Sequence, residues 1–133
     1  VVIDGAFHVC NAFTPGMQTR EQGAIINILD SSVWKPWPNF VAHTTAKGAL
    51  AAMTRQLALD LAPSIRVNAV VPGPVLPPEQ MQHDRQAALA QQTLLKRWGE
   101  PGDVAQAVRY LIEADYVTGE LLFVDGGERL TRV

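Results

Sequence analysis

Three apolar runs stand out along the chain, and each is followed at once by turn-forming residues. The runs cover residues 24–29 (AIINIL), 65–71 (IRVNAVV) and 121–124 (LLFV), and the residues after them are Asp30-Ser31-Ser32, Pro72-Gly73-Pro74 and Asp125-Gly126-Gly127. Short, nearly continuous runs of Ile, Val and Leu are typical of strands that are buried on both faces. The pattern therefore predicts three strands of a parallel sheet covered by helices.

Between these runs the apolar residues return at helical spacing. One stripe over residues 42–61 occupies positions 46, 49, 50, 53, 57 and 61, and another over residues 101–113 occupies Val104, Val108, Leu111 and Ile112. Such stripes are typical of helices that bury one face. A helix over residues 3–13, disturbed at residues 14–16, is expected before the first strand, and a polar, Gln-rich helical excursion over residues 77–97 after the second.

The predicted elements alternate between helix and strand, which implies right-handed crossovers and a parallel sheet. The length of 133 residues suits one small domain. We therefore expect an α/β fold over residues 1–133, with about three parallel strands and covering helices.

Composition narrows the class of protein. Eleven Lys and Arg residues stand against thirteen Asp and Glu residues, a net charge of −2, whereas a nucleic-acid surface needs a basic excess. No apolar run approaches the roughly 18 residues that span a bilayer, and no secretory leader pattern opens the sequence. The one cysteine, Cys10, matches no disulfide or zinc pattern. We expect a cytoplasmic protein without metal, nucleic-acid or membrane partners.

Candidate chemistry follows the first two strands, because ligands of open parallel sheets bind beyond the carboxyl ends of the strands. Asp30 and the turn at residues 72–74 occupy such positions. His43 and Lys47 are four residues apart at the start of the helix over residues 42–61, so they share one face. Each feature also has a structural interpretation: Asp30 as a turn cap, the His-Lys pair as a solvated helix edge, and the turn as a rigid connection.

Four segments together resemble the C-terminal half of a short-chain dehydrogenase/reductase. They read GAIINI, HTTAKGALAAMTRQLALDLAPSIRVNAVVPGPV, GEPGDVAQAVRYL and VTGELLFVDGG, and the resemblance extends from about Gly5 to Gly127. It implies a partial Rossmann-like domain that lacks the family's N-terminal dinucleotide-binding half. Asp at position 30, followed by this helix, is most similar to the pteridine reductase branch.

The family's catalytic pattern is Tyr-x-x-x-Lys with a Ser thirteen residues before the Tyr. Here Lys47 matches the Lys, His43 stands at the Tyr position and Asp30 at the Ser position. The family's catalytic Asn would fall at Val2. The resemblance implies that Asp30 takes part in proton transfer. Lys47 disfavours a charged imidazolium and Asp30 favours it, so a His43–Asp30 couple is a chemically possible proton donor.

By the same resemblance the cofactor is NADPH. Lys47 would bind the nicotinamide ribose, and the backbone around Pro72, Gly73 and Val75 would border the carboxamide. The sequence contains no glycine-rich turn for the pyrophosphate.

Aromatic residues in the loop between Asp30 and His43 suggest where a substrate would lie. Trp34 and Trp37, with Phe40, would stack on a flat heteroaromatic ring or, alternatively, fill a gap between helices. Residues 77–97 take the position of the family's substrate lid or are a plain surface helix.

Two functions remain open from the sequence. The first is an NADPH-dependent reductase that transfers hydride to a small pteridine-like or carbonyl substrate. As in related enzymes, it would form a homo-oligomer (dimer or tetramer) through the helix over residues 42–61, with Ala51 and Ala52 on the contact face. The alternative is a catalytically inactive, truncated relative that acts as a subunit or fragment.

Overall fold

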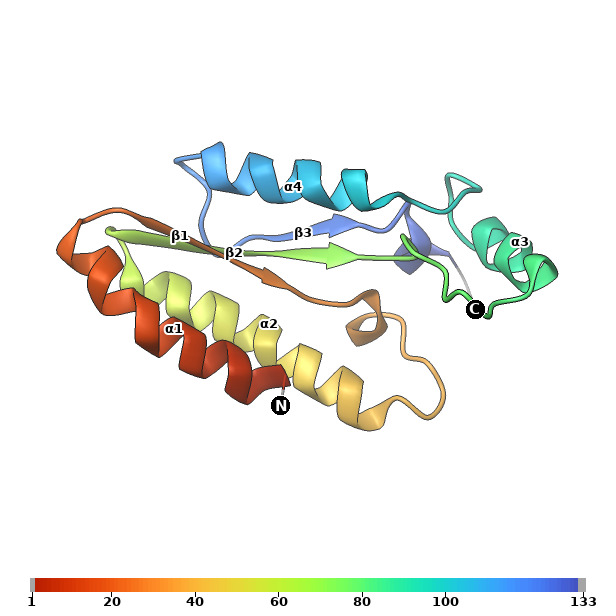
Figure 1. The fold of residues 1–133 in the computed structure, drawn as a ribbon, viewed down its shortest axis with the longest axis horizontal. Coiled ribbons are helices and arrows are strands. Elements are labelled where there is room, and N and C mark those ends of the chain that lie inside the picture. The colour runs from red at the N-terminus through yellow and green to blue at the C-terminus, as the bar shows by residue number, and fades with distance from the viewer. Residues whose placement is uncertain (1, 132–133) are drawn as a thin grey trace.

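The computed structural model describes residues 2–131 as a parallel sheet between helical layers (Figure 1). The helices and strands are α1 (Val2–Thr19), β1 (Gly23–Ile28), α2 (Val41–Leu61), β2 (Ile65–Pro72), α3 (His83–Gln91), α4 (Pro101–Glu113) and β3 (Leu121–Val124). Two 3-10 turns, η1 (Ser31–Val33) and η2 (Glu128–Leu130), follow β1 and β3. Helices α1 and α2 cover one face of the sheet and α4 covers the other.

The strand order is β1-β2-β3, and both pairs are parallel. Strand β2 lies in the centre, which explains its many small apolar residues: Val67, Ala69, Val70 and Val71 are fully buried. The three parallel strands and the helices around them confirm the predicted α/β, Rossmann-like fold. No helix among residues 2–131 has the length and apolar character to cross a membrane.

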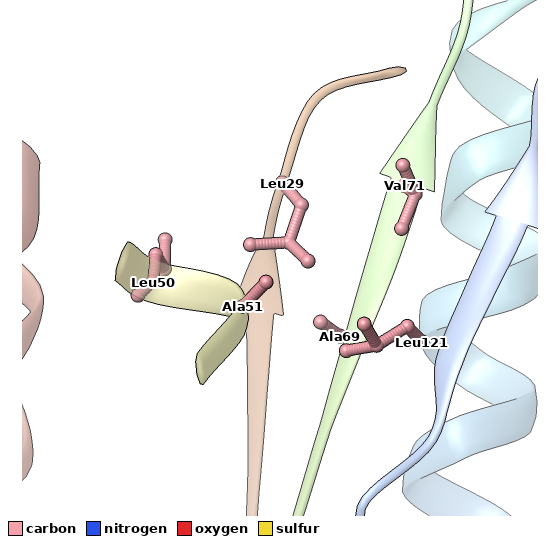
Figure 2. Packing of buried hydrophobic residues seen from close by; sticks show 6 residues of the cluster. All are labelled: Leu29, Leu50, Ala51, Ala69, Val71 and Leu121. Carbon is pink, nitrogen blue, oxygen red and sulfur yellow. The ribbon is translucent and has the colours of Figure 1, made fainter. Parts of the chain in front are cut away.

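The apolar core lies on both faces of β2. On the α2 side, a cluster joins the helix to all three strands or their ends (Figure 2); its buried members are Leu29, Leu50, Ala51, Ala69, Val71 and Leu121. On the α4 side, Leu111 and Ala107 pack against Val70. Ala51 is 8% exposed and belongs to this core, so the prediction that it forms an intersubunit face is wrong, whereas Ala52 is exposed.

One polar side chain is built into the central strand. Asn68 is fully buried, and its Nδ2 donates to the carbonyl oxygen of Val117 at 2.8 Å while its Oδ1 accepts from the Glu120 N–H at 2.9 Å. Buried amides require such partners. Asn68 therefore fixes the loop that leads into β3.

Helix α1 runs past the break that the sequence predicts at residues 14–16, and it includes Pro15. Proline removes one intrahelical hydrogen bond. However, Met17 beyond it packs against Ala58, Ile65 and Val67, and this packing holds the last turn in place. The sequence predicts a helical segment over residues 77–97. Only α3 is a helix in this range, and its other residues form turns or irregular structure.

Candidate active site

Asp30 lies two residues after the last residue of β1 and has two partners. Its Oδ1 accepts the Ser32 N–H at 2.7 Å, which makes it the N-cap of η1. Its Oδ2 lies 3.1 Å from Nε2 of His43, which is on the first turn of α2. Asp30 is therefore the turn cap of the structural interpretation, and its second oxygen is hydrogen-bonded to His43 at the same time.

The pair is open enough to meet another molecule. The side chains of Asp30 and His43 are 24% and 36% exposed. Burial disfavours ionisation of Asp30, but hydrogen bonds from Ser32 and His43 outweigh it and lower the pKa of this carboxyl. Asp30 is therefore a carboxylate at neutral pH.

Lys47 lies one turn beyond His43. Its Nζ donates to the carbonyl oxygen of Ile28, the last residue of β1, at 2.7 Å. An ammonium group has three donors. One bond therefore fixes Lys47 at the end of the strand, and its remaining donors are available to hydroxyl groups.

A cavity of about 1170 Å³ opens between the loop after η1 and the segment around α3. Its walls come from four parts of the chain: Lys35, Pro36, Trp37, Pro38 and Phe40; Gly73, Pro74, Val75, Leu76, Pro78, Gln80, Met81 and Gln82; Arg85, Leu89, Gln92 and Trp98; and Glu128. The ring of Phe40 joins the cavity to the site, since its centroid lies 6.1 Å from that of His43. A volume of this size admits a small organic ligand.

The two tryptophans expected at the substrate lie in different places. Trp37 lines the cavity, with its ring edge-to-face on Phe40 at 5.5 Å between centroids. Trp34 is absent from the cavity wall and packs edge-to-face on Phe123 of β3 at 4.7 Å. The guanidinium of Arg129 covers the same Phe123 ring at 3.9 Å. Trp34 thus joins the loop to the C-terminal segment.

The turn after β2 places backbone groups at the cavity. Gly73 and Val75 line it, whereas Pro72 ends β2 outside its wall. A Cβ on Gly73 would lie 2.7 Å from the Cα of Asp125, so only glycine fits where these two segments meet. Among the described residues no acceptor pairs with the Val75 N–H. This free N–H and the spare donors of Lys47 fit a nicotinamide carboxamide and its ribose, respectively.

Glu128 is a site residue that the sequence analysis missed. It is 6% exposed, lines the cavity, and accepts a hydrogen bond from the Ser31 hydroxyl at 3.1 Å through Oε2. Lys35 holds the same turn, because its Nζ donates to the Glu128 carbonyl oxygen at 3.4 Å and to the Thr131 hydroxyl at 2.8 Å. The signal available in the sequence was a carboxyl directly after the Gly-Gly turn that ends the third strand.

Glu128 should make stability depend on pH. Burial raises the pKa of its carboxyl above the ordinary value of 4.5, and nearby Asp125 and Asp30 add to this, against the opposing effects of Ser31 and Lys35. The folded state then holds the proton more tightly than the unfolded chain. The free energy of unfolding should therefore fall as pH rises from about 4.5 through the raised pKa.

Glu128→Gln should abolish this fall and unfold at higher urea concentration than the unsubstituted chain at pH 7, with no difference near pH 4. The lowered pKa of Asp30 acts below 3.8, outside this range. Urea titrations at several pH values measure the effect, and Glu79→Gln, at an exposed position, is the control. Parallel pH profiles for Glu128→Gln and the unsubstituted chain would contradict the expectation.

The chain is similar to known proteins over nearly its whole length. The model of the enoyl-(acyl carrier protein) reductase family matches residues 1–128. The 3beta-hydroxysteroid dehydrogenase 1 of Eggerthella lenta is 36% identical over 138 residues, 98% of this chain and 53% of the relative. The 3-oxoacyl-[acyl-carrier-protein] reductase of Bos taurus is 36% identical over 129 residues, 96% of this chain and 54% of the relative.

The chain is also similar to a solved structure. The alternative dihydrofolate reductase 1, FolM, of Brucella suis, in complex with NADP, superimposes with a TM-score of 0.77 at 39% identity, over 84% of this chain and 45% of that one. Parallel strands with helices on both faces and polar residues at the strand ends define the Rossmann-like class. Within it, the chain belongs to the short-chain dehydrogenase/reductase family. The chain spans about half the length of the curated relatives it matches.

Among residues 2–131, no group of three or more His, Cys, Asp or Glu side chains is placed to hold a metal ion.

Proposed function

We propose that this chain carries the substrate and nicotinamide half of an NADPH-dependent reductase that acts on a small pteridine-like or carbonyl substrate. The observation that carries the proposal is the Asp30–His43 hydrogen bond of 3.1 Å, with His43 in ring contact with Phe40, a residue that lines a cavity of about 1170 Å³. The NADP complex of the FolM relative supports the cofactor, and that relative's description as a dihydrofolate reductase supports a pteridine-like substrate.

Reduction of a C=O or C=N bond needs a hydride at carbon and a proton at the heteroatom, and NADPH supplies the hydride when bound. In this proposal the His43 imidazolium donates the proton to the substrate's oxygen or nitrogen, and the negative charge of Asp30 stabilises the imidazolium beforehand. Lys47 binds the ribose hydroxyls, and the Val75 N–H binds the carboxamide oxygen. The product is the alcohol or amine, with NADP⁺.

The second candidate is a catalytically inactive relative that acts as a subunit or fragment. One observation favours it: His43 stands where the family has Tyr. The backbone N–H groups of a glycine-rich turn supply much of the affinity for a dinucleotide, and residues 1–133 do not contain such a turn.

The proposal is tested by joining this chain to a family-type N-terminal half and measuring NADPH binding by calorimetry and NADPH oxidation with a dihydropterin and with carbonyl compounds. The chain alone should not bind NADPH measurably, whereas the joined protein should bind it and oxidise it. Lys47→Met should weaken NADPH binding, and Lys96→Met, at an exposed position outside the site, should leave it unchanged. A joined protein that binds NADPH without turnover would favour the inactive relative.

A homo-oligomer, dimer or tetramer, is part of the same proposal. Exposed small residues on α2, Ala49 and Ala52, lie on the side of the helix away from the sheet. Such residues allow another helix to approach closely.

A further inference from the structure

The cavity has flat apolar walls on two sides. Trp37 and Phe40 come from the loop before α2, and Trp98 comes from the segment before α4. Trp98 is fixed in place, because its Nε1 donates to the carbonyl oxygen of Gln86 in α3 at 2.9 Å. Aromatic walls of this kind suit a flat ring.

The carboxyl of Glu128 is the one acidic group on this wall. Its Oε2 accepts the Ser31 hydroxyl, whereas its Oε1 has no donor among the described residues. No buried side-chain nitrogen or oxygen atom in the described chain lacks a partner, so Oε1 is reached by solvent, and Glu128 is one of the residues that line the cavity.

The surroundings hold this carboxyl in place without neutralising it by direct pairing. Lys35 binds the backbone of the Glu128 turn and the hydroxyl of Thr131, and it makes no ion pair with the Glu128 carboxyl among the described residues. Ser31 occupies one of about four lone-pair positions of the carboxylate. Acceptor capacity thus remains on a residue that lines the cavity together with Trp37, Phe40 and Trp98, and that is hydrogen-bonded to Ser31, the residue after Asp30.

We propose that Glu128 is a specificity-determining residue that selects flat heteroaromatic substrates with an amino-substituted amidine edge. Two parallel N–H donors on such an edge match a carboxylate in the two-bond arrangement known from guanidinium–carboxylate pairs. A ring that presents a carbonyl oxygen in place of the amino group would instead face the carboxylate with a lone pair. The inference rests on the proposed function, since it concerns the substrate of the same site.

Binding of two probe rings to this chain tests the proposal without any turnover. Pterin carries a 2-amino group, and lumazine carries a carbonyl oxygen at the same position. Calorimetry should show pterin bound about 10- to 100-fold more tightly than lumazine, as expected for hydrogen bonds to a charged group. Glu128→Gln, which keeps an acceptor for Ser31, should reduce this preference to less than about threefold, and Glu128→Ala should do the same. Glu79→Gln should leave it unchanged.

Selectivity is the decisive quantity, because a merely structural role of Glu128 would weaken both rings equally. Equal affinities for pterin and lumazine, a preference that survives Glu128→Gln, or no binding of either ring would overturn the proposal. Turnover of the joined protein is measured separately. A joined protein that reduces carbonyl compounds but shows no pterin preference would retain the proposed reductase and reject the role of Glu128. Pterin selectivity without turnover would retain the role of Glu128 and reject the proposed reductase.

Discussion

Replacing His43 with alanine is expected to slow NADPH-dependent reduction by the joined protein about 10²- to 10⁴-fold, the range that a general acid contributes. The reason is that no other imidazole in the described chain bonds to Asp30. Steady-state kinetics should show the loss in kcat.

Two further variants distinguish the reductase from the inactive relative. His83→Ala, at the exposed start of α3, is the matched control and should keep the unsubstituted rate. His43→Tyr restores the family's usual residue. If the natural protein is inactive, this variant should raise activity above that of the unsubstituted joined protein. A loss below twofold in His43→Ala would exclude His43 as the proton donor.

Leu111→Ala is expected to lower the free energy of unfolding by about 2–5 kcal/mol. Leu111 is fully buried between α4 and the sheet, where it packs with Val70 and Ala107, so truncation leaves a cavity in the core. A domain of this size has a total stability of about 5–15 kcal/mol, so the loss is a large part of it. Urea denaturation should show a lower midpoint with an unchanged slope.

The neighbouring residue on the same helix is the control. Ile112 is 53% exposed, so Ile112→Ala should change stability by no more than about 1 kcal/mol. Similar midpoints for the two variants would contradict the assignment of Leu111 to the core.

Local sequence patterns were sufficient for the sheet. The runs that became β1, β2 and β3 are apolar because helices cover the sheet, and this leaves a plain signal in the sequence. Asp30 and His43 were paired through the resemblance to the family's catalytic pattern, and the structure places their side chains 3.1 Å apart. Their roles in catalysis remain predictions.

Other features depend on contacts between distant segments, which no local pattern shows. Glu128 reaches Ser31 across 97 positions of the chain. Trp34 and Trp37 lie three residues apart in one loop, and nothing in the sequence distinguishes them. In the structure, however, the Trp34 ring packs on Phe123 of β3, whereas Trp37 lines the cavity. Pro15 predicts the end of a helix, but Met17 packs against the core, and α1 continues to Thr19. In each case tertiary packing outweighs the local preference.

Strand β1 has β2 on one side only among the described residues. Neighbouring residues of a strand direct their amide groups to opposite sides. Since the Leu29 N–H donates to Val70, the amides of Ile25 and Asn27 also face β2, and those of Ala24, Ile26 and Ile28 face outward. Amide hydrogen exchange along this strand should therefore alternate residue by residue between slow and fast. A second chain that pairs with this edge would slow only the even-numbered amides, whereas one that docks on α2 would leave the alternation intact.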